Sequence, residues 1–200
     1  PCNINKVCQQ VGVPMIHLSS GCVYNGYDKQ YTEDDVPNFG FFNEESSFYS
    51  KTKHVAEMML SNCWMFRLRM PYCGEEHPRN YLTKILSYNN LINMQNSMTG
   101  VEDFCNFLGA FLEGGMSYPY GIYNVVNDGA IEAKEIVGIM YEYGLKNPYH
   151  RFIPLNQLRT KAKRSNCILS TDKIKKIGLA LPQVRQSITA AIIQLADRGL

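Results

Sequence analysis

Short apolar runs alternate with longer amphipathic stretches along most of this chain. Three of the runs, residues 14–18, 64–69 and 121–126, have the length and the side chains of buried strands. Stretches with a helical spacing of apolar residues separate them. Strands that alternate with helices form a parallel sheet, because each crossover helix returns the chain to the same end of the sheet. The sequence therefore predicts an α/β fold, a parallel sheet with helices on both faces.

The same patterns locate the individual elements. We expect strands at residues 14–18, 64–69, 91–94 and 121–126, and helices at residues 4–11, 47–60, 81–88, 101–112, 132–143 and 170–177. Ser170 is the expected cap of the last of these helices. Core faces are expected at Val101, Phe104, Leu108, Phe111 and Leu112, and on a final helix at Val184, Ile188, Ala191, Ile192 and Leu195. The polar segment 25–46 is predicted to be a loop, and its length suggests a function.

Composition excludes several classes of protein. The 200 residues carry a net charge of only +2 and no dense basic cluster, so we expect no nucleic-acid partner. No apolar stretch is long enough to span a membrane. The seven cysteines are scattered and odd in number, which indicates reduced thiols and a cytoplasmic location. The four isolated histidines have no metal-ligand spacing, so no metal site is expected.

Tyr49 and Lys53 are the first candidates for catalysis. They are four residues apart at the start of a predicted helix, so their side chains share one face. A nearby ammonium group favours the phenolate and lowers the pKa of a tyrosine, which can then protonate a carbonyl oxygen. Ser20 follows a predicted strand at the edge where open α/β sheets bind ligands. A surface helix with a basic edge would show the same tyrosine–lysine spacing, so the upstream serine is needed for the interpretation.

Strand-end Ser20, then Tyr49 and Lys53, resembles the catalytic triad of the extended short-chain dehydrogenase/reductase family. Further blocks make the resemblance more specific: Ser20-Gly21-Cys22, residues 48–53, residues 67–71, Pro78 to Lys84, and residues 96–99. Together they resemble the bifunctional epimerase/reductases that make UDP-L-rhamnose from UDP-4-keto-6-deoxy-D-glucose, found in plants and in some giant viruses. The resemblance extends over most of the chain and is weak after residue 105.

The resemblance implies two reactions at one site. Cys22 and Lys84 match the acid/base pair for epimerisation at C3 and C5 of the sugar. Ser20, Tyr49 and Lys53 would serve the reduction at C4, with NADPH or NADH as cofactor, and the lysine would also hold the nicotinamide ribose. Without the resemblance, Cys22 would be a small buried residue at a strand end and Lys84 a solvated helix residue.

The resemblance also implies contacts to cofactor and substrate. Cofactor-binding residues would be Tyr49, Lys53 and Pro71. The implied contacts to a nucleotide-diphosphate-sugar substrate are Arg79, Asn80, Ser97, Met98 and Arg164. Arg79 suits a phosphate because its guanidinium can donate two parallel hydrogen bonds. Family members are often homodimers, so a homodimer is a possible assembly.

One expected part of a nucleotide-binding fold is missing. The chain has no glycine-rich turn for a pyrophosphate, and residues 109–115 lack the lysine of a phosphate loop. We therefore expect a Rossmann-like sheet without its N-terminal glycine-rich part, together with a small C-terminal substrate-binding part. In this interpretation residues 1–75 are the C-terminal half of an NAD(P)-binding domain that carries the triad. Residues 76–200 are a mixed region that mainly binds the nucleotide sugar.

Three alternatives remain open at this stage. A monofunctional 4-keto-sugar reductase of the dTDP-rhamnose type needs the triad without Cys22 and Lys84. An enzyme similar to GDP-fucose synthase would carry a histidine at the position of Lys84. A non-catalytic module or an inactive fragment would explain the missing cofactor cradle. Departures from the plant pattern at residues 25–30, 40–45 and 165–168 leave open the exact sugar and the choice between UDP and dTDP.

Overall fold

The computed structural model describes residues 1–158, 160 and 162–199. Three parallel strands form the main sheet in the order β1-β2-β4. Their bounds are Ile16–Ser20, Trp64–Leu68 and Gly121–Asn124. Ser20 lies opposite Leu68, so β1 and β2 end together. The predicted parallel α/β arrangement is confirmed.

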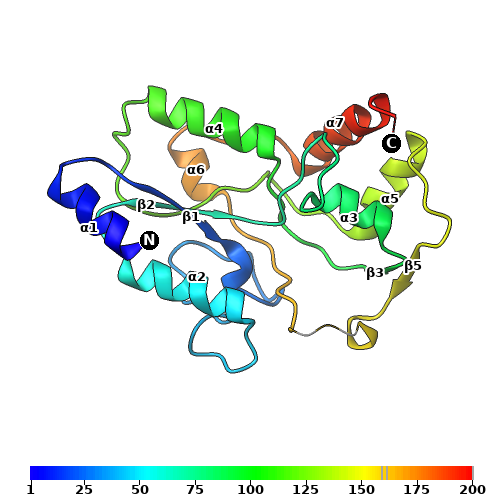
Figure 1. Ribbon diagram of the computed structural model, residues 1–200, viewed down its shortest axis with the longest axis horizontal. Coiled ribbons are helices and arrows are strands. Elements are labelled where there is room, and N and C mark those ends of the chain that lie inside the picture. Colours follow the sequence, from blue (N-terminus) through cyan, green and yellow to red (C-terminus); the bar gives the residue numbers. More distant parts are fainter. Residues whose placement is uncertain (159, 161, 200) are drawn as a thin grey trace.

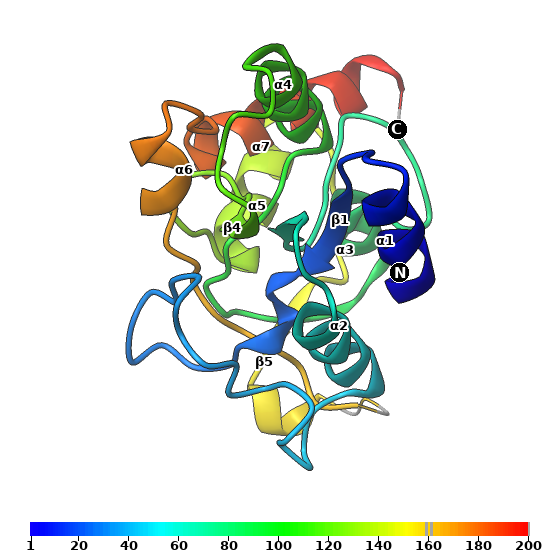
Figure 2. The same ribbon diagram turned by 90° about the vertical axis from the view of Figure 1, so that its left-hand side faces the viewer.

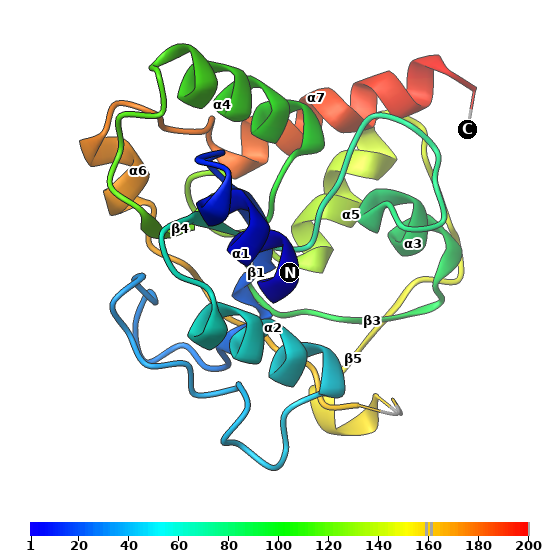
Figure 3. The ribbon, with the colours of Figure 1, turned by 60° about the vertical axis from the view of Figure 1, so that its left-hand side comes forward.

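Helices cover both faces of this sheet (Figure 1). The helix α4, Val101–Glu113, packs on one face, where Phe66 and Trp64 of β2 meet Phe111 and Phe107. The helices α1 (Cys2–Gln10) and α2 (Phe48–Met59) lie on the other face. Figure 3 shows α4 on one side of the strands and α2 on the other. Packing against the sheet thus fixes the position of α2, which carries the tyrosine and the lysine.

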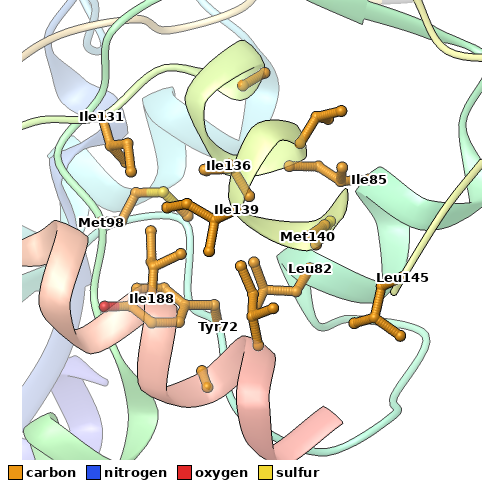
Figure 4. Close-up of a cluster of buried hydrophobic side chains, with 14 of the residues drawn as sticks. Tyr72, Leu82, Ile85, Met98, Ile131, Ile136, Ile139, Met140, Leu145 and Ile188 are labelled. Carbon is orange, nitrogen blue, oxygen red and sulfur yellow. The ribbon is translucent and has the colours of Figure 1, made fainter. Parts of the chain in front are cut away.

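A second layer of structure lies beside the sheet. It consists of a parallel pair of short strands, β3 (Asn90–Ile92) and β5 (Arg151–Ile153), and of three helices. The helices are α3 (Tyr81–Ser87), α5 (Ala133–Glu142) and α7 (Val184–Asp197). Their apolar side chains form one core, in which Leu82, Ile139 and Ile188 are buried (Figure 4). This core fixes α3 and, with it, the position of Lys84.

The remaining elements connect these two parts. They are η1 (Gly21–Val23), η2 (Leu155–Gln157) and α6 (Asp172–Lys176). Figure 2 shows the long segment after η1 extending beyond α2 on the side away from α4, as expected for a loop. None of the helices in the described part of the chain combines the length and the apolar character needed to cross a bilayer.

The structure corrects three details of the sequence interpretation. On α4, Val101 and Leu112 are exposed, and Phe107 takes their place in the core because the helix turns a narrower face to the sheet. The cap residue of α6 is Thr171, although the Ser170 hydroxyl accepts a hydrogen bond from the Asp172 N–H at 3.2 Å. The strand β5 was not predicted. It has only three residues and two of them are exposed, so its sequence lacks the apolar pattern of a buried strand.

Candidate active site

The end of β1 positions the first pair of candidate residues. The Ser20 hydroxyl accepts a hydrogen bond from the Cys22 N–H at 3.2 Å and thereby starts the short helix η1. A Cβ atom on Gly21 would lie 2.6 Å from Cδ1 of Leu169, so a side chain there would push that leucine aside. The tight turn places the side chain of Cys22 two residues beyond the strand, at the wall of a cavity.

The first turn of α2 positions Tyr49. Ser47 caps the helix, because its hydroxyl accepts a hydrogen bond from the Ser50 N–H at 3.0 Å. The tyrosine is half exposed and faces the same cavity as Cys22. The ammonium group of Lys53 lies 5.7 Å from the centroid of the tyrosine ring. It donates a hydrogen bond to the Leu18 carbonyl at 3.0 Å, so it links α2 to β1.

The pKa of Tyr49 differs from the sequence expectation. Burial raises the pKa of its phenol, the Ser20 hydroxyl lowers it by hydrogen bonding, and the charge of Cys22 raises it. The net direction is upward, whereas we expected Lys53 to lower it. Lys53 is not among the groups that shift this pKa, and its ammonium group is hydrogen-bonded to the Leu18 carbonyl. Ser20 and Cys22 both lie close enough to affect the pKa of Tyr49, and the catalytic roles of the three residues stay predictions.

A cavity of about 720 Å³ brings most of the predicted residues together. Its lining includes six of them: Cys22, Tyr49, Pro71, Arg79, Lys84 and Arg164. Lys163 also lines it, so the wall carries several cations, and no aspartate or glutamate of the described residues contributes to it. A wall of this charge favours an anionic ligand.

Three predicted substrate residues do not reach the cavity lining. Asn80 is buried and caps α3: its side-chain oxygen accepts from the Leu82 N–H, and its amide donates to the carbonyls of Cys73 and Glu75. The hydroxyl of Ser97 accepts from the Leu169 N–H, and Met98 lies in the core. These three residues stabilise the segments around the cavity through buried contacts and are not part of its lining. Their predicted contact with a substrate stays a prediction.

A buried network holds α2 against the sheet. Arg67 of β2 donates to both carboxylate oxygens of Glu57 on α2, at 2.9 Å and 2.7 Å. The same carboxylate accepts from the Ser19 hydroxyl at 2.5 Å, and Arg67 also donates to the Tyr24 hydroxyl. Burial raises the pKa of Tyr24 to about 12, so its hydroxyl remains a hydrogen-bond donor. The network joins β1, β2 and α2, and so links the strand that ends in Ser20 to the helix that carries Tyr49.

The sequence analysis missed two cavity residues. Arg69 is fully buried and lines the cavity next to Cys22. Tyr81 lines it one helical turn before Lys84, and burial raises its pKa to about 12, although Arg69 and Arg164 lower it. A signal for Arg69 was present, since two arginines in an otherwise apolar strand must find polar partners inside the protein. For Tyr81 there was no such signal.

Comparisons with known proteins identify the family and the fold of the chain. The family model described as the RmlD substrate binding domain matches residues 1–196. The chain is 32% identical over 198 residues to the trifunctional UDP-glucose 4,6-dehydratase/UDP-4-keto-6-deoxy-D-glucose 3,5-epimerase/UDP-4-keto-L-rhamnose-reductase RHM1 of Arabidopsis thaliana. The match covers 91% of this chain and 28% of the plant protein, so the chain spans little more than a quarter of that relative.

Two solved structures show the same fold. The L780 UDP-rhamnose synthase from Acanthamoeba polyphaga mimivirus has a TM-score of 0.81 at 27% identity, covering 96% of this chain and 68% of the viral protein. A dTDP-4-dehydrorhamnose reductase from Bacillus anthracis in complex with NADP has a TM-score of 0.75 at 16% identity, covering 100% of this chain and 70% of the bacterial one. The fold is therefore Rossmann-like, as predicted. This chain belongs to the RmlD substrate-binding-domain family.

Proposed function

We propose that the full-length protein is a nucleotide-sugar 3,5-epimerase/4-reductase. It would convert a UDP- or dTDP-4-keto-6-deoxy-hexose to the L-rhamnose nucleotide with NADPH or NADH. The observation that carries the proposal is that Cys22, Tyr49 and Lys84, from three separate elements, line one cavity. The chain is similar to a plant enzyme named for these activities and to a viral UDP-rhamnose synthase.

The reductive step uses the side of the cavity formed by β1 and α2. Tyr49 is the proton donor to the C4 oxygen, and a phenol with a raised pKa holds this proton at neutral pH. Ser20, whose hydroxyl acts on the phenol, orients the same oxygen. NADPH or NADH, when bound, supplies the hydride at C4. Pro71 lines the cavity and fits the nicotinamide end of such a cofactor, and Lys53, which is hydrogen-bonded to the Leu18 carbonyl on β1 beside Tyr49, would hold its ribose.

The epimerisation step uses Cys22 and Lys84. A C–H bond next to the C4 ketone is acidic, because the electron pair left behind is delocalised as an enolate. One of the two groups takes this proton, and the other returns a proton to the opposite face of the same carbon. Cys22 comes from the turn after β1 and Lys84 from α3, so they approach the cavity from different elements.

The cations of the cavity wall suit a sugar diphosphate. Arg79 and Arg164 are exposed and line the cavity, and neither has a carboxylate partner within 4 Å in the described part of the chain. Guanidinium groups bind phosphate oxygens through pairs of charge-assisted hydrogen bonds. We infer that these two arginines bind the diphosphate, and Tyr88 at the same wall offers a ring to the nucleotide base.

The test is proton exchange by the full-length protein in deuterated water. Incubation with UDP-4-keto-6-deoxy-D-glucose without NADPH is expected to introduce deuterium at C3 and C5, as measured by NMR. Cys22→Ser and Lys84→Met should each abolish the exchange, whereas Arg185→Ala, a change far from the cavity, should preserve it. Oxidation of NADPH without any deuterium uptake would leave only a monofunctional reductase. If the protein neither exchanges deuterium into the sugar nor oxidises NADPH, the enzymatic proposal is wrong.

Two properties of the full-length protein remain part of the proposal. We infer a cytoplasmic location, since all seven cysteines are free in the structure. We also infer a possible homodimer, because α1 and α2 expose Ile4, Val7, Phe48 and Met58. Light scattering of the full-length protein measures the oligomeric state directly.

A further inference from the structure

Arg69 is a buried cation without a matching anion. Its side chain is 1% exposed, and no carboxylate lies within 4 Å of its guanidinium in the part of the chain that the structure describes. Two positions earlier in the chain, Arg67 is equally buried but shares two hydrogen bonds with the Glu57 carboxylate. The two arginines therefore differ in how their charge is compensated.

The partners of Arg69 are neutral groups and one thiol. Its Nη2 donates to Oδ1 of Asn96 at 2.5 Å and to the Ser165 carbonyl at 2.7 Å, and its Nη1 donates to the Ser165 hydroxyl at 3.0 Å. The same Nη1 lies 3.6 Å from Sγ of Cys22. The Nε atom is buried and has no hydrogen-bond partner among the described residues. Neutral oxygens solvate the guanidinium, but they cannot balance its charge.

A buried charge is costly unless an opposite charge accompanies it. Arginine cannot avoid this cost by losing its proton, because a guanidinium group stays charged in proteins. The charge of Arg69 also reaches Tyr81 and Cys167, but burial raises the pKa of both, and both remain neutral. Cys22 is the ionisable group in direct contact with the guanidinium, and it is only partly buried at the wall of the cavity.

We propose that Arg69 is a positioning residue for Cys22: it holds the sulfur at the cavity wall and stabilises its thiolate. This proposal rests on the proposed function and deepens it by assigning to Cys22 the removal of the proton from the carbon next to the ketone. In that step the C–H bond breaks, the proton passes to the sulfur, and the negative charge moves to the C4 oxygen of the enolate. Lys84 returns a proton from its ammonium group to the other face, and both groups then exchange with water.

A purely structural role is the competing explanation. Arg69 also connects the end of β2 to Asn96 and to the segment around Ser165, so it could act only as a link between them. The variant Ser165→Ala is a matched control, because it removes one partner of the same Nη1 atom and leaves Cys22 and the arginine in place. A structural link predicts similar behaviour for the two variants.

The test is the rate at which iodoacetamide alkylates Cys22 at pH 7 in the full-length protein without substrate. Peptide mass spectrometry follows Cys22, with Cys8 on α1 as an internal reference, because only the thiolate reacts. We expect Arg69→Gln to slow alkylation of Cys22 by roughly tenfold, the scale of one charge-assisted contact. Arg69→Lys should restore part of the rate, and Ser165→Ala should stay within about twofold of the unaltered protein. A folded Arg69→Gln protein that reacts at the unaltered rate overturns the proposal.

A second measurement covers the case in which Arg69→Gln does not fold. In the unaltered protein, Cys22 should react at pH 7 at least as fast as the same residue after unfolding in urea, although it is partly buried. If Cys22 is alkylated about ten times more slowly in the native protein than in the unfolded protein, the proposal that Arg69 stabilises its thiolate is wrong. Neither measurement needs the sugar, so the pair of residues can be tested even if the deuterium experiment rules out the epimerase.

Discussion

The two sides of the cavity are built differently. Ser20, Cys22 and Tyr49 stand on a strand end, its following turn and a long helix, all joined by the buried Glu57–Arg67 network. The opposite side carries exposed cations on irregular segments, such as Arg79 before α3 and Arg164 in a loop. Proton transfer depends on positions within fractions of an ångström, whereas attraction of a diphosphate tolerates mobile charges. We infer that the rigid side performs the reduction and shares the epimerisation with Lys84 on α3, whereas the irregular segments provide affinity.

The largest expected effect comes from breaking the network on the rigid side. Glu57→Ala leaves Arg67 buried without its anion, and we expect it to lower the free energy of unfolding by about 3–5 kcal/mol. Urea denaturation of the full-length protein measures this. The double variant Glu57→Leu/Arg67→Met removes both charges and should recover most of the loss. A loss below about 1 kcal/mol for the single variant would mean that the network does not anchor α2.

The next effect separates the two reactions on the rigid side. Tyr49→Phe removes the proton donor, and we expect the rate of NADPH oxidation to fall roughly 10³-fold, within the range of general acid catalysis. Deuterium exchange at C3 and C5 should stay near the unaltered rate, because Cys22 and Lys84 are intact. Equal losses of both activities would contradict the division of roles among these residues.

Sequence reasoning located the local features of the site better than the contacts between distant segments. The strand end, the helix cap and the tyrosine–lysine spacing are local patterns, so Ser20, Tyr49 and Lys53 could be placed on correct elements. The apolar run around Arg69 indicates only that this arginine needs polar partners, and the partners themselves, Asn96 and Ser165, are distant in the sequence. The direction of the Tyr49 pKa was wrong for a similar reason, since burial and the Leu18 carbonyl depend on the tertiary structure.

On the irregular side we expect a smaller effect, confined to affinity. Arg79→Ala and Arg164→Ala should each weaken UDP binding roughly tenfold, the scale of one charge-assisted hydrogen bond. Isothermal titration calorimetry measures the affinity, and kcat should change far less than KM. Arg185→Ala, on α7 and paired with Glu135, is the matched control and should bind UDP normally. If both cavity variants bind UDP as tightly as the unaltered protein, the diphosphate does not bind to these two arginines.

The smallest effect tests a contact between the rigid helix and the loop that follows η1. Nδ1 of His54 on α2 accepts a hydrogen bond from the Phe41 N–H at 2.9 Å. Burial lowers the pKa of His54 below its ordinary value, and the charge of Glu57 opposes this. The unfolded state therefore binds a proton more readily than the folded state. Stability is complete above the ordinary pKa of about 6.5 and is lost as the pH falls through the lower folded value.

We expect His54→Gln to reduce this loss of stability between pH 7 and pH 5, because glutamine does not titrate. The change should be smaller than the effect of Glu57→Ala, because it removes one lowered pKa and leaves no buried charge without its partner. Thermal denaturation at several pH values measures it, and His77→Gln, an exposed histidine before α3, serves as the control. His17, whose pKa burial also lowers, should maintain part of the pH dependence in the variant. An identical pH profile for His54→Gln and the unaltered protein would show that the loop is held by other contacts, such as the packing of Gly40 against the imidazole ring.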